Sequence, residues 1–150
     1  MVALPNDWPI TGVGLLALTF LNVFQLLKVS GQRKKAQVAY PALYADAAEA
    51  KADPEKFKFN CIQRAHANTL EYIPYIMGMF AYTGVFHPKP ATAVVCAWAF
   101  GRVFYTLGYA TGNPAARNGG LGALAGLSSI ALFFGTIYTV ATQVIALNLF

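Results

Sequence analysis

Hydrophobic residues occur along the chain in four long runs that are separated by shorter polar stretches. The first and last runs are almost free of charged side chains, whereas the second begins with polar residues and becomes apolar only after Glu71. About 20 apolar residues in helical conformation are enough to cross the hydrocarbon core of a bilayer. The pattern therefore predicts an all-α fold, a four-transmembrane-helix bundle, with helices at residues 9–29, 59–86, 91–109 and 119–147.

The amino-acid composition agrees with a membrane location. Hydrophobic residues make up 57% of the chain and charged residues only 11%. Soluble domains carry about 25% charged residues, so this chain has too few to cover a surface that faces water. We therefore expect an integral membrane protein, with residues 1–150 forming one domain.

Positive charge is concentrated beside the first polar loop. The third connection contributes Arg117, whereas the second contributes only Lys89. Positively charged loops usually remain in the cytosol, so we expect loops 1 and 3 to be cytosolic. Because this topology explains the net charge of +5, we do not expect the protein to bind nucleic acid. The basic residues around loop 1 are Lys28, Arg33, Lys34, Lys35, Lys51, Lys56 and Lys58.

The polar first half of the second run carries side chains at helical spacing. Arg64, Asn68 and Glu71 recur at i, i+4 and i+7 and would share one helix face, with His66 and Tyr72 on either side. Ionisable residues in a membrane helix usually face a cavity or the interior of a bundle. We interpret this face as part of a binding site, and a purely structural Arg64–Glu71 ion pair is the alternative.

The third run carries a second polar face. Arg102, Tyr105 and Tyr109 follow one another at i, i+3 and i+7. Two tyrosines near a helix end can also form an interfacial aromatic belt. We expect a cavity-lining role, because an intramembrane arginine points inward. Both polar faces lie toward loops 1 and 3, which predicts one polar site open to the cytosol.

The residues available for chemistry are rich in arginine and poor in nucleophiles. The sequence offers no Ser–His–acid set, no catalytic-cysteine arrangement and no phosphate-binding glycine loop. Cys61 and Cys96 lie in separate apolar runs, and we expect no metal site because closed sites need three or four ligands. Any nucleophile would then come from a ligand, whose carboxylates the arginines can grip and whose ammonium group Glu71 can accept.

Four segments of the sequence closely resemble a known family. They are RKKAQVAYPALYA (33–45), RAHANTLE (64–71), GVFHPKPA (84–91) and GRVFYTLGYATGNP (101–114). These motifs at this spacing resemble the superfamily of membrane-associated proteins in eicosanoid and glutathione metabolism, over residues 29–122. The resemblance implies a homotrimer of four-helix subunits with glutathione bound between neighbours. It also implies the endoplasmic reticulum membrane, with the outer mitochondrial membrane as the alternative.

The resemblance also implies roles for individual residues. Arg117 would be the catalytic residue that stabilises the glutathione thiolate, and Arg33 would hold a ligand carboxylate from the adjacent subunit. His66 stands where the related leukotriene-C synthase has glutamine, and Lys34 where that synthase has arginine. With Arg102 from the helical pattern, the expected glutathione-binding residues are Arg33, Arg64, His66, Asn68, Glu71, Tyr72, Arg102, Tyr105 and Tyr109.

The expected activity follows from thiol chemistry. A free cysteine thiol has a pKa of about 8.5, and a close positive charge lowers that pKa by about 1–3 units. The thiolate would attack a hydrophobic lipid electrophile or reduce a lipid hydroperoxide. We therefore expect a glutathione transferase with glutathione-dependent peroxidase activity, and leukotriene-C synthase activity as a further expectation. The alternatives are a non-catalytic lipid-binding scaffold of the same superfamily and a small transporter or channel subunit.

Overall fold

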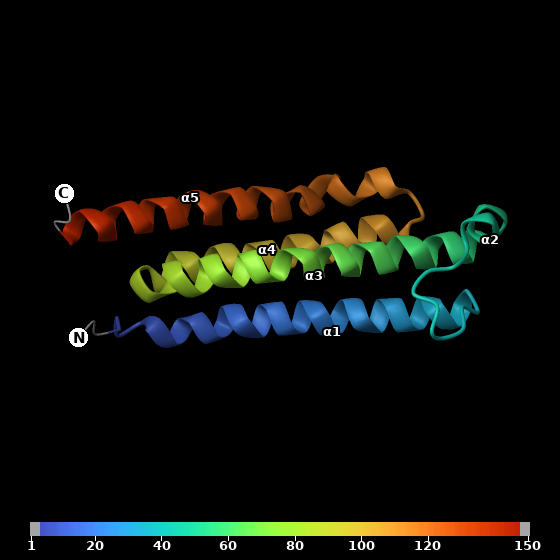
Figure 1. The fold of residues 1–150 in the computed structure, drawn as a ribbon, viewed down its shortest axis with the longest axis horizontal. Coiled ribbons are helices and arrows are strands. Elements are labelled where there is room, and N and C mark those ends of the chain that lie inside the picture. Colours follow the sequence, from blue (N-terminus) through green and yellow to red (C-terminus); the bar gives the residue numbers. More distant parts are fainter. Residues whose placement is uncertain (1–3, 148–150) are drawn as a thin grey trace.

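The computed structural model describes residues 4–147, and in this part of the chain every regular element is helical (Figure 1). Four long helices lie side by side, and a short helix, α2, stands at one end of the bundle. Three short 3₁₀ segments precede α1 and α5: η1 (Trp8–Ile10), η2 (Pro114–Asn118) and η3 (Gly120–Gly122). The α-helices are α1 (Thr11–Lys35), α2 (Ala47–Ala52), α3 (Pro54–Phe86), α4 (Pro88–Ala110) and α5 (Ala123–Ala146).

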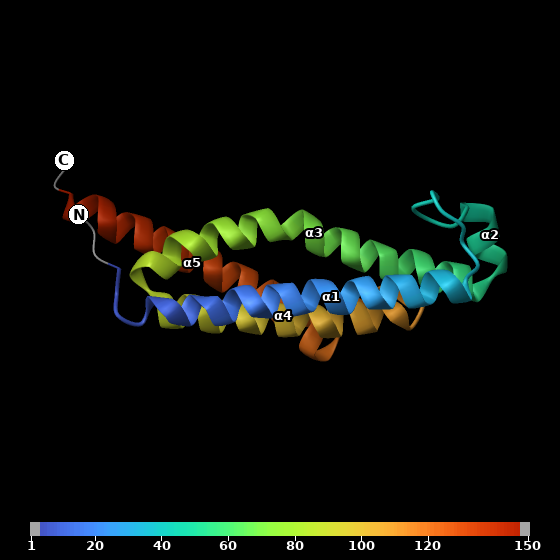
Figure 2. The ribbon, with the colours of Figure 1, turned by 90° about the horizontal axis from the view of Figure 1, so that it is seen from below.

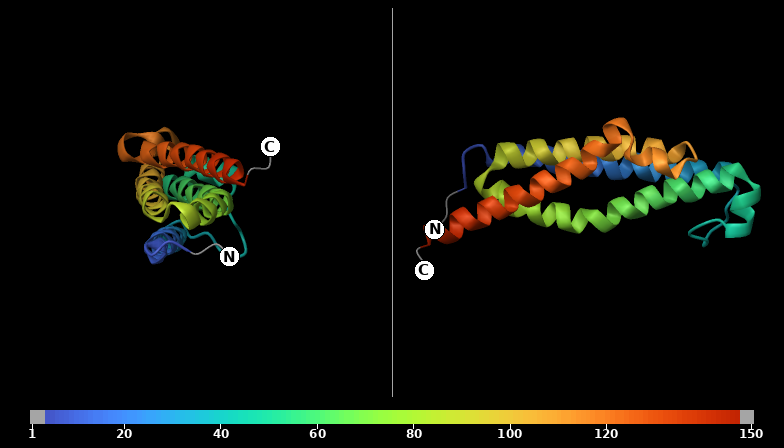
Figure 3. Two further views of the ribbon diagram at one scale, coloured as in Figure 1. Left: turned by 90° about the vertical axis from the view of Figure 1, so that its left-hand side faces the viewer. Right: turned by 90° about the horizontal axis from the view of Figure 1, so that it is seen from above.

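Helix α4 is the central element of the bundle. It packs against α1, α3 and α5, and α1 and α5 lie on opposite sides of the α3–α4 pair (Figures 1 and 3). Helix α3 is bowed along its length and contains Pro74 (Figure 2), which removes one backbone hydrogen bond. The described termini lie at one end of the bundle, which we call the termini end. The α1–α3 and α4–α5 connections lie at the other, the loop end.

Three segments are long and apolar enough to cross a membrane: Trp8–Lys35, Pro88–Ala110 and Gly120–Ala146. Large apolar side chains cover the outward faces of α1 and α5, including Phe20 at 69% exposure and Leu127 at 63%. A surface of this kind is stable against lipid and not against water. Helix α3 is not among the three segments, since its first half carries the polar residues described above.

The charged residues flanking the predicted helices are themselves helical. Helix α3 begins at Pro54 rather than at the expected residue 59. The Asp53 side chain caps it by accepting a hydrogen bond from the Glu55 backbone nitrogen at 2.8 Å. Proline is favoured at the first helical position, so Asp53-Pro54 is a strong start signal. Helix α1 likewise continues to Lys35, past the expected end at residue 29.

The apolar core occupies the middle of the bundle, where Trp98 of α4 is only 1% exposed. Helices α4 and α5 approach closely beside Gly101, because a Cβ atom there would collide with the backbone of Ala125. This contact holds α5 against α4 just beyond the polar residues of α4. The core cluster contains Leu18, Leu21, Ile76, Phe80, Ala91, Val95, Trp98, Ala99, Ala125 and Leu132.

Candidate active site

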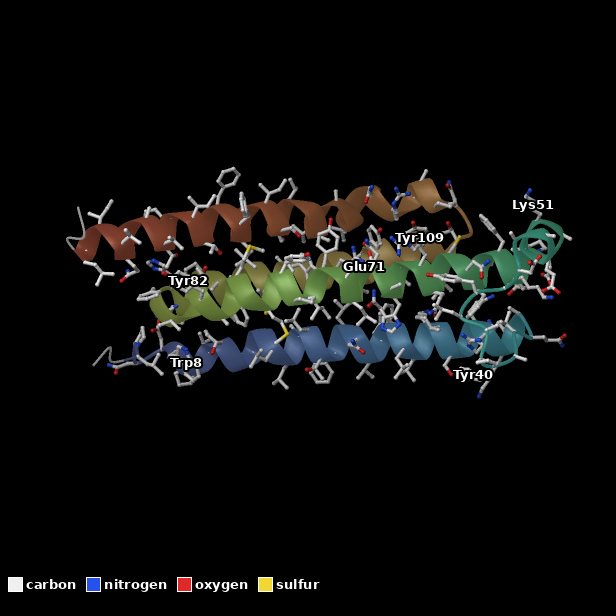
Figure 4. The ribbon with its side chains drawn as sticks, in the orientation of Figure 1. Trp8, Tyr40, Lys51, Glu71, Tyr82 and Tyr109 are labelled. Carbon is white, nitrogen blue, oxygen red and sulfur yellow. The ribbon has the colours of Figure 1, made fainter. Side chains whose placement is uncertain are left out.

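A cavity of about 460 Å³ lies among α3, α4, α5 and the η2 segment. Figure 4 shows Glu71 and Tyr109 on neighbouring helices, nearer to the loop end than Trp8 and Tyr82. We call the space the α3–α4–α5 cavity. Its lining comprises Asn68, Tyr72, Trp98, Arg102, Tyr105, Arg117, Asn118, Gly122, Ala125, Gly126, Ser129 and Ile130.

Arg102 contributes a buried guanidinium group to the cavity wall. The residue is only 5% exposed. Its Nε and Nη2 atoms donate to Thr69 Oγ1 at 3.0 and 2.6 Å, and Nη2 also donates to the Ala65 carbonyl at 3.2 Å. All these acceptors are neutral, and no carboxylate within residues 4–147 forms a salt bridge with Arg102. The guanidinium therefore keeps an uncompensated positive charge.

Helix α1 reaches this arginine through a buried glutamine. Gln25 is fully buried, and its Nε2 atom donates to Thr69 Oγ1 at 2.7 Å and to Thr106 Oγ1 at 2.8 Å. The hydroxyl of Thr106 in turn donates to the carbonyl of Arg102 at 2.8 Å. Hydrogen bonds of this kind are strong in a dry interior and fix the geometry of their members. Three helices therefore position Arg102 together.

Two tyrosines connect Arg102 to Arg117 along α4. The Arg102 guanidinium lies 3.9 Å from the Tyr105 ring centroid, and the Tyr105 and Tyr109 rings meet edge to face at 5.4 Å. The Arg117 guanidinium lies 5.4 Å from the Tyr109 ring. Cation–π contacts favour these positions for both arginines. The result is a row in which two positive groups flank a tyrosine pair.

The backbone of η2 holds Arg117 against α4. Asn113 caps η2 by accepting from Ala115 N at 3.0 Å, and Arg117 donates to the Pro114 carbonyl. A Cβ atom on Gly108 would lie only 2.9 Å from Arg117 Cα, so glycine permits this close approach. The segment that carries Arg117 is thus packed directly on the last turns of α4.

Arg64 and Glu71 lie on an exposed face of α3 beside the cavity. Their side chains pair at 2.7 Å and are 50% and 53% exposed. Asn68 connects them to the cavity wall, because its Nδ2 donates to Glu71 at 3.4 Å and its Oδ1 accepts from the Tyr105 hydroxyl at 3.3 Å. Neither member of the ion pair is among the residues that line the cavity.

The structure places two further expected site residues away from the cavity. Arg33 is buried at the end of α1, donates to the Ala42 carbonyl at 2.8 Å and lies between the rings of Tyr40 and Phe59. Arg33 therefore organises the chain that follows α1. His66 is half-buried, and its buried Nε2 has no hydrogen-bond partner within residues 4–147.

Three polar residues that support the site were not expected to belong to it: Gln25, Thr69 and Thr106. For Thr106 the sequence does hold a signal, since it follows Arg102 by one helical turn. Thr69 comes directly after the expected site residue Asn68, and its hydroxyl oxygen accepts hydrogen bonds from Arg102 of α4. Only the packing of α3 against α4 shows that contact.

The chemistry of the cavity is defined by two guanidinium groups, tyrosine and asparagine side chains, and apolar residues of α5. No aspartate or glutamate lines it. Within residues 4–147, no group of three or more His, Cys, Asp or Glu side chains is placed to hold a metal ion. The cavity therefore suits an organic anion that carries or meets an apolar group.

This fold and cavity define a helical membrane protein with an arginine-lined cavity toward the loop end. The sequence matches the MAPEG family over residues 11–139, and the chain belongs to that family. The family consists of membrane proteins whose members use glutathione, and it includes glutathione transferases, peroxidases and non-catalytic proteins. The match and the three apolar helices point to an integral membrane protein.

Proposed function

We propose that the protein is a membrane-bound glutathione transferase, similar to the third microsomal glutathione S-transferase, with glutathione-dependent peroxidase activity. The observation that carries this proposal is the row Arg102–Tyr105–Tyr109–Arg117 at the α3–α4–α5 cavity. Two guanidinium groups without a carboxylate partner attract an anion, and glutathione carries two carboxylates and can form a thiolate. The apolar residues of α5 offer a place for a hydrophobic second substrate.

In this proposal Arg117 stabilises the thiolate. Its positive charge lowers the pKa of the glutathione thiol, so the thiol proton leaves to solvent at neutral pH. The thiolate then attacks an electrophilic carbon of a lipid and forms a C–S bond, while the bond from that carbon to its leaving group or ring oxygen breaks and the departing atom takes a proton from solvent. With a lipid hydroperoxide it attacks the terminal oxygen, releasing the alcohol and a sulfenic acid. A second glutathione converts that acid to the disulfide and water.

We further propose that the functional unit is a homotrimer with α3 as its fourth membrane-spanning helix. The support is the exposure of the Arg64–Glu71 pair and of Tyr75, which is 72% exposed on the same helix. A charged pair is costly in contact with hydrocarbon, and a neighbouring subunit would cover it. Glutathione bound between subunits would then contact Arg64, His66, Asn68, Glu71 and Tyr72 of one subunit and Arg33 of the next.

The proposed location is the endoplasmic reticulum membrane, with loops 1 and 3 in the cytosol. The support is the position of the lysines, since Lys34, Lys35 and Lys51 all lie at the loop end. Glutathione would then enter the cavity from the cytosolic side.

The test is a titration of glutathione onto the purified, detergent-solubilised protein, monitored by the ultraviolet absorbance of the thiolate. We expect a thiolate signal at neutral pH in the native protein, a weaker one in Arg117→Lys and none in Arg117→Ala. Lys51→Ala, which removes an exposed charge on α2, is the matched control and should behave as the native protein does.

A non-catalytic lipid-binding scaffold is the competing function. The observation that favours it is that Arg64 and Glu71 already satisfy each other without a ligand. Glutathione binding without a thiolate signal in native protein or variants would support the scaffold. Absence of glutathione binding would refute the transferase proposal.

A further inference from the structure

A second polar space, separate from the α3–α4–α5 cavity, lies at the loop end between α1 and α3. It has a volume of about 450 Å³ and shares no lining residue with the cavity. We call it the α1–α3 groove. Its lining comprises Leu27, Lys28, Gly31, Gln32, Lys35, Glu55, Lys58, Ile62 and Ala110.

The groove carries more positive charge than its own acidic residue can neutralise. Glu55 accepts from Gln32 Nε2 at 2.8 Å and from Lys58 Nζ at 3.2 Å, so its carboxylate is already engaged by two partners. Neither Lys28 nor Lys35 forms a salt bridge within the part of the chain that the structure describes. Lys28 and Lys35, about two helical turns apart on α1, thus line this space without a carboxylate partner in the described residues.

Part of the groove lining is apolar. Leu27 of α1 is 66% exposed, and Ile62 of α3 is buried. Lys28 and Lys35 belong to the last turns of Trp8–Lys35, a segment long and apolar enough to span the bilayer. The groove therefore combines cationic side chains with an apolar side chain, Leu27, on the exposed surface of α1.

We propose that the α1–α3 groove binds an anionic phospholipid. Lys28 and Lys35 contact the headgroup phosphate, Lys58 stays paired with Glu55 at 3.2 Å, and an acyl chain lies along Leu27. Lysine ammonium groups beside a membrane surface attract anionic lipids, each with about 1 kcal/mol. Zwitterionic phospholipids carry no net charge and gain less from the same lysines. The inference does not depend on the reaction proposed for the cavity.

The experiment is a titration of delipidated, detergent-solubilised full-length protein with phosphatidic acid or phosphatidylcholine, with bound lipid counted by native mass spectrometry. We expect the native protein to prefer phosphatidic acid. Lys28→Gln/Lys35→Gln should weaken binding of phosphatidic acid by about tenfold or more. The matched control Lys34→Gln/Lys51→Gln removes the same charge from exposed positions outside the groove and should change binding less than about twofold.

Several outcomes would overturn the proposal. Equal losses in the two double variants would show diffuse attraction to the basic loop end rather than a site. Equal binding of the two lipids by native protein would remove the role of charge. Displacement of the lipid by inorganic phosphate or by glutathione at millimolar concentration would identify a soluble anion as the ligand.

One further outcome would support the proposal: retained binding of phosphatidic acid in Lys28→Arg/Lys35→Arg, with an unchanged thermal midpoint.

Discussion

Arg102 and Arg64 lie on neighbouring helices, but they differ in burial and in the charge of their hydrogen-bond partners. Arg64 is half-exposed and paired with the carboxylate of Glu71 at 2.7 Å. Arg102 is 5% exposed and has only neutral acceptors, among which Thr69 Oγ1 receives two of its N–H groups. The charge of Arg64 is neutralised by Glu71, whereas Arg102 keeps its charge beside the α3–α4–α5 cavity.

The difference shows where a ligand has the most to contribute. A buried guanidinium with neutral partners has lost its hydration without gaining a counter-charge, so an anion in the cavity would stabilise it. An exposed ion pair has no comparable need, because solvent screens both charges. We infer that affinity for an anion resides mainly in the row of Arg102 and Arg117, and that Arg64 and Glu71 select among anions.

The largest effect is expected from Thr69→Val. The change removes the acceptor shared by Gln25 and Arg102 while keeping the shape of the side chain. It leaves the buried Nε–H of charged Arg102 without an acceptor, and Gln25 Nε2 and Arg102 Nη2 each lose one of two acceptors, which should lower the free energy of unfolding by about 3 kcal/mol. Thermal unfolding in detergent measures this change.

Two variants give this first prediction its controls. Thr69→Ser keeps the hydroxyl and should lose little, and Thr19→Val removes an exposed hydroxyl that bonds only to its own helix at Leu15. If Thr69→Val were no less stable than Thr19→Val, the network would not hold Arg102.

The next largest effect is expected from Gly108→Ala, which should displace Arg117 from its position against α4. The new Cβ would lie 2.8 Å from the carbonyl carbon of Ala116, so η2 must move away from α4. A shift of about 1 Å in a catalytic group can reduce the rate by about 100-fold. We expect conjugation of glutathione to an aromatic halide to slow by about tenfold or more, and the thermal midpoint to fall as well, because the new Cβ meets backbone atoms of η2. Gly78→Ala, where the Cβ would meet no atom within 4 Å, is the matched control and should keep its rate.

Helical spacing predicted part of the cavity wall. Arg102 and Tyr105 both line the cavity, as the i, i+3 pattern indicates, and Asn68 of α3 meets Tyr105 through a hydrogen bond. The other members of the two predicted faces, Arg64, Glu71 and Tyr109, are not among the lining residues. The all-α character was likewise predictable, because apolar runs of this length favour membrane helices. The roles of these residues in glutathione binding remain a prediction.

The contacts between helices were not predictable from the pattern. Thr69 and Gln25 are ordinary polar residues in apolar runs, and only the packing of α1, α3 and α4 brings them into the network around Arg102. The position of Arg33 depends on the path of the chain after α1, which returns the Ala42 carbonyl to the guanidinium. Periodicity fixes the faces of a helix, but tertiary packing decides what each face meets.

A smaller effect is expected from Glu71→Gln, which tests the exposed half of the comparison. If Glu71 binds the ammonium group of glutathione, its loss should raise the Kd of glutathione by about tenfold, since charged hydrogen bonds are the stronger ones. Isothermal titration of the detergent-solubilised protein measures the Kd. Glu49→Gln breaks a surface pair with Lys56 of similar length, 2.8 Å, and should leave the Kd unchanged. Equal Kd values in the two variants would return Arg64 and Glu71 to a structural role.

The smallest effect is expected at Glu55, a surface carboxylate of the loop end. Its pKa lies below the ordinary value of 4.5, first because Gln32 donates a hydrogen bond to it and then because Lys58 does so. A pKa that is lower in the folded state adds stability above the unfolded value, and this contribution is lost as the pH falls below 4.5 through the lowered pKa. The thermal midpoint of native protein should therefore fall between pH 7 and pH 4 by slightly more than that of Gln32→Leu. An equal fall in the two proteins would show that solvent, rather than Gln32, sets the pKa of Glu55. It would also show that this exposed carboxylate adds little to the stability of the fold, unlike the buried hydrogen bonds of Arg102.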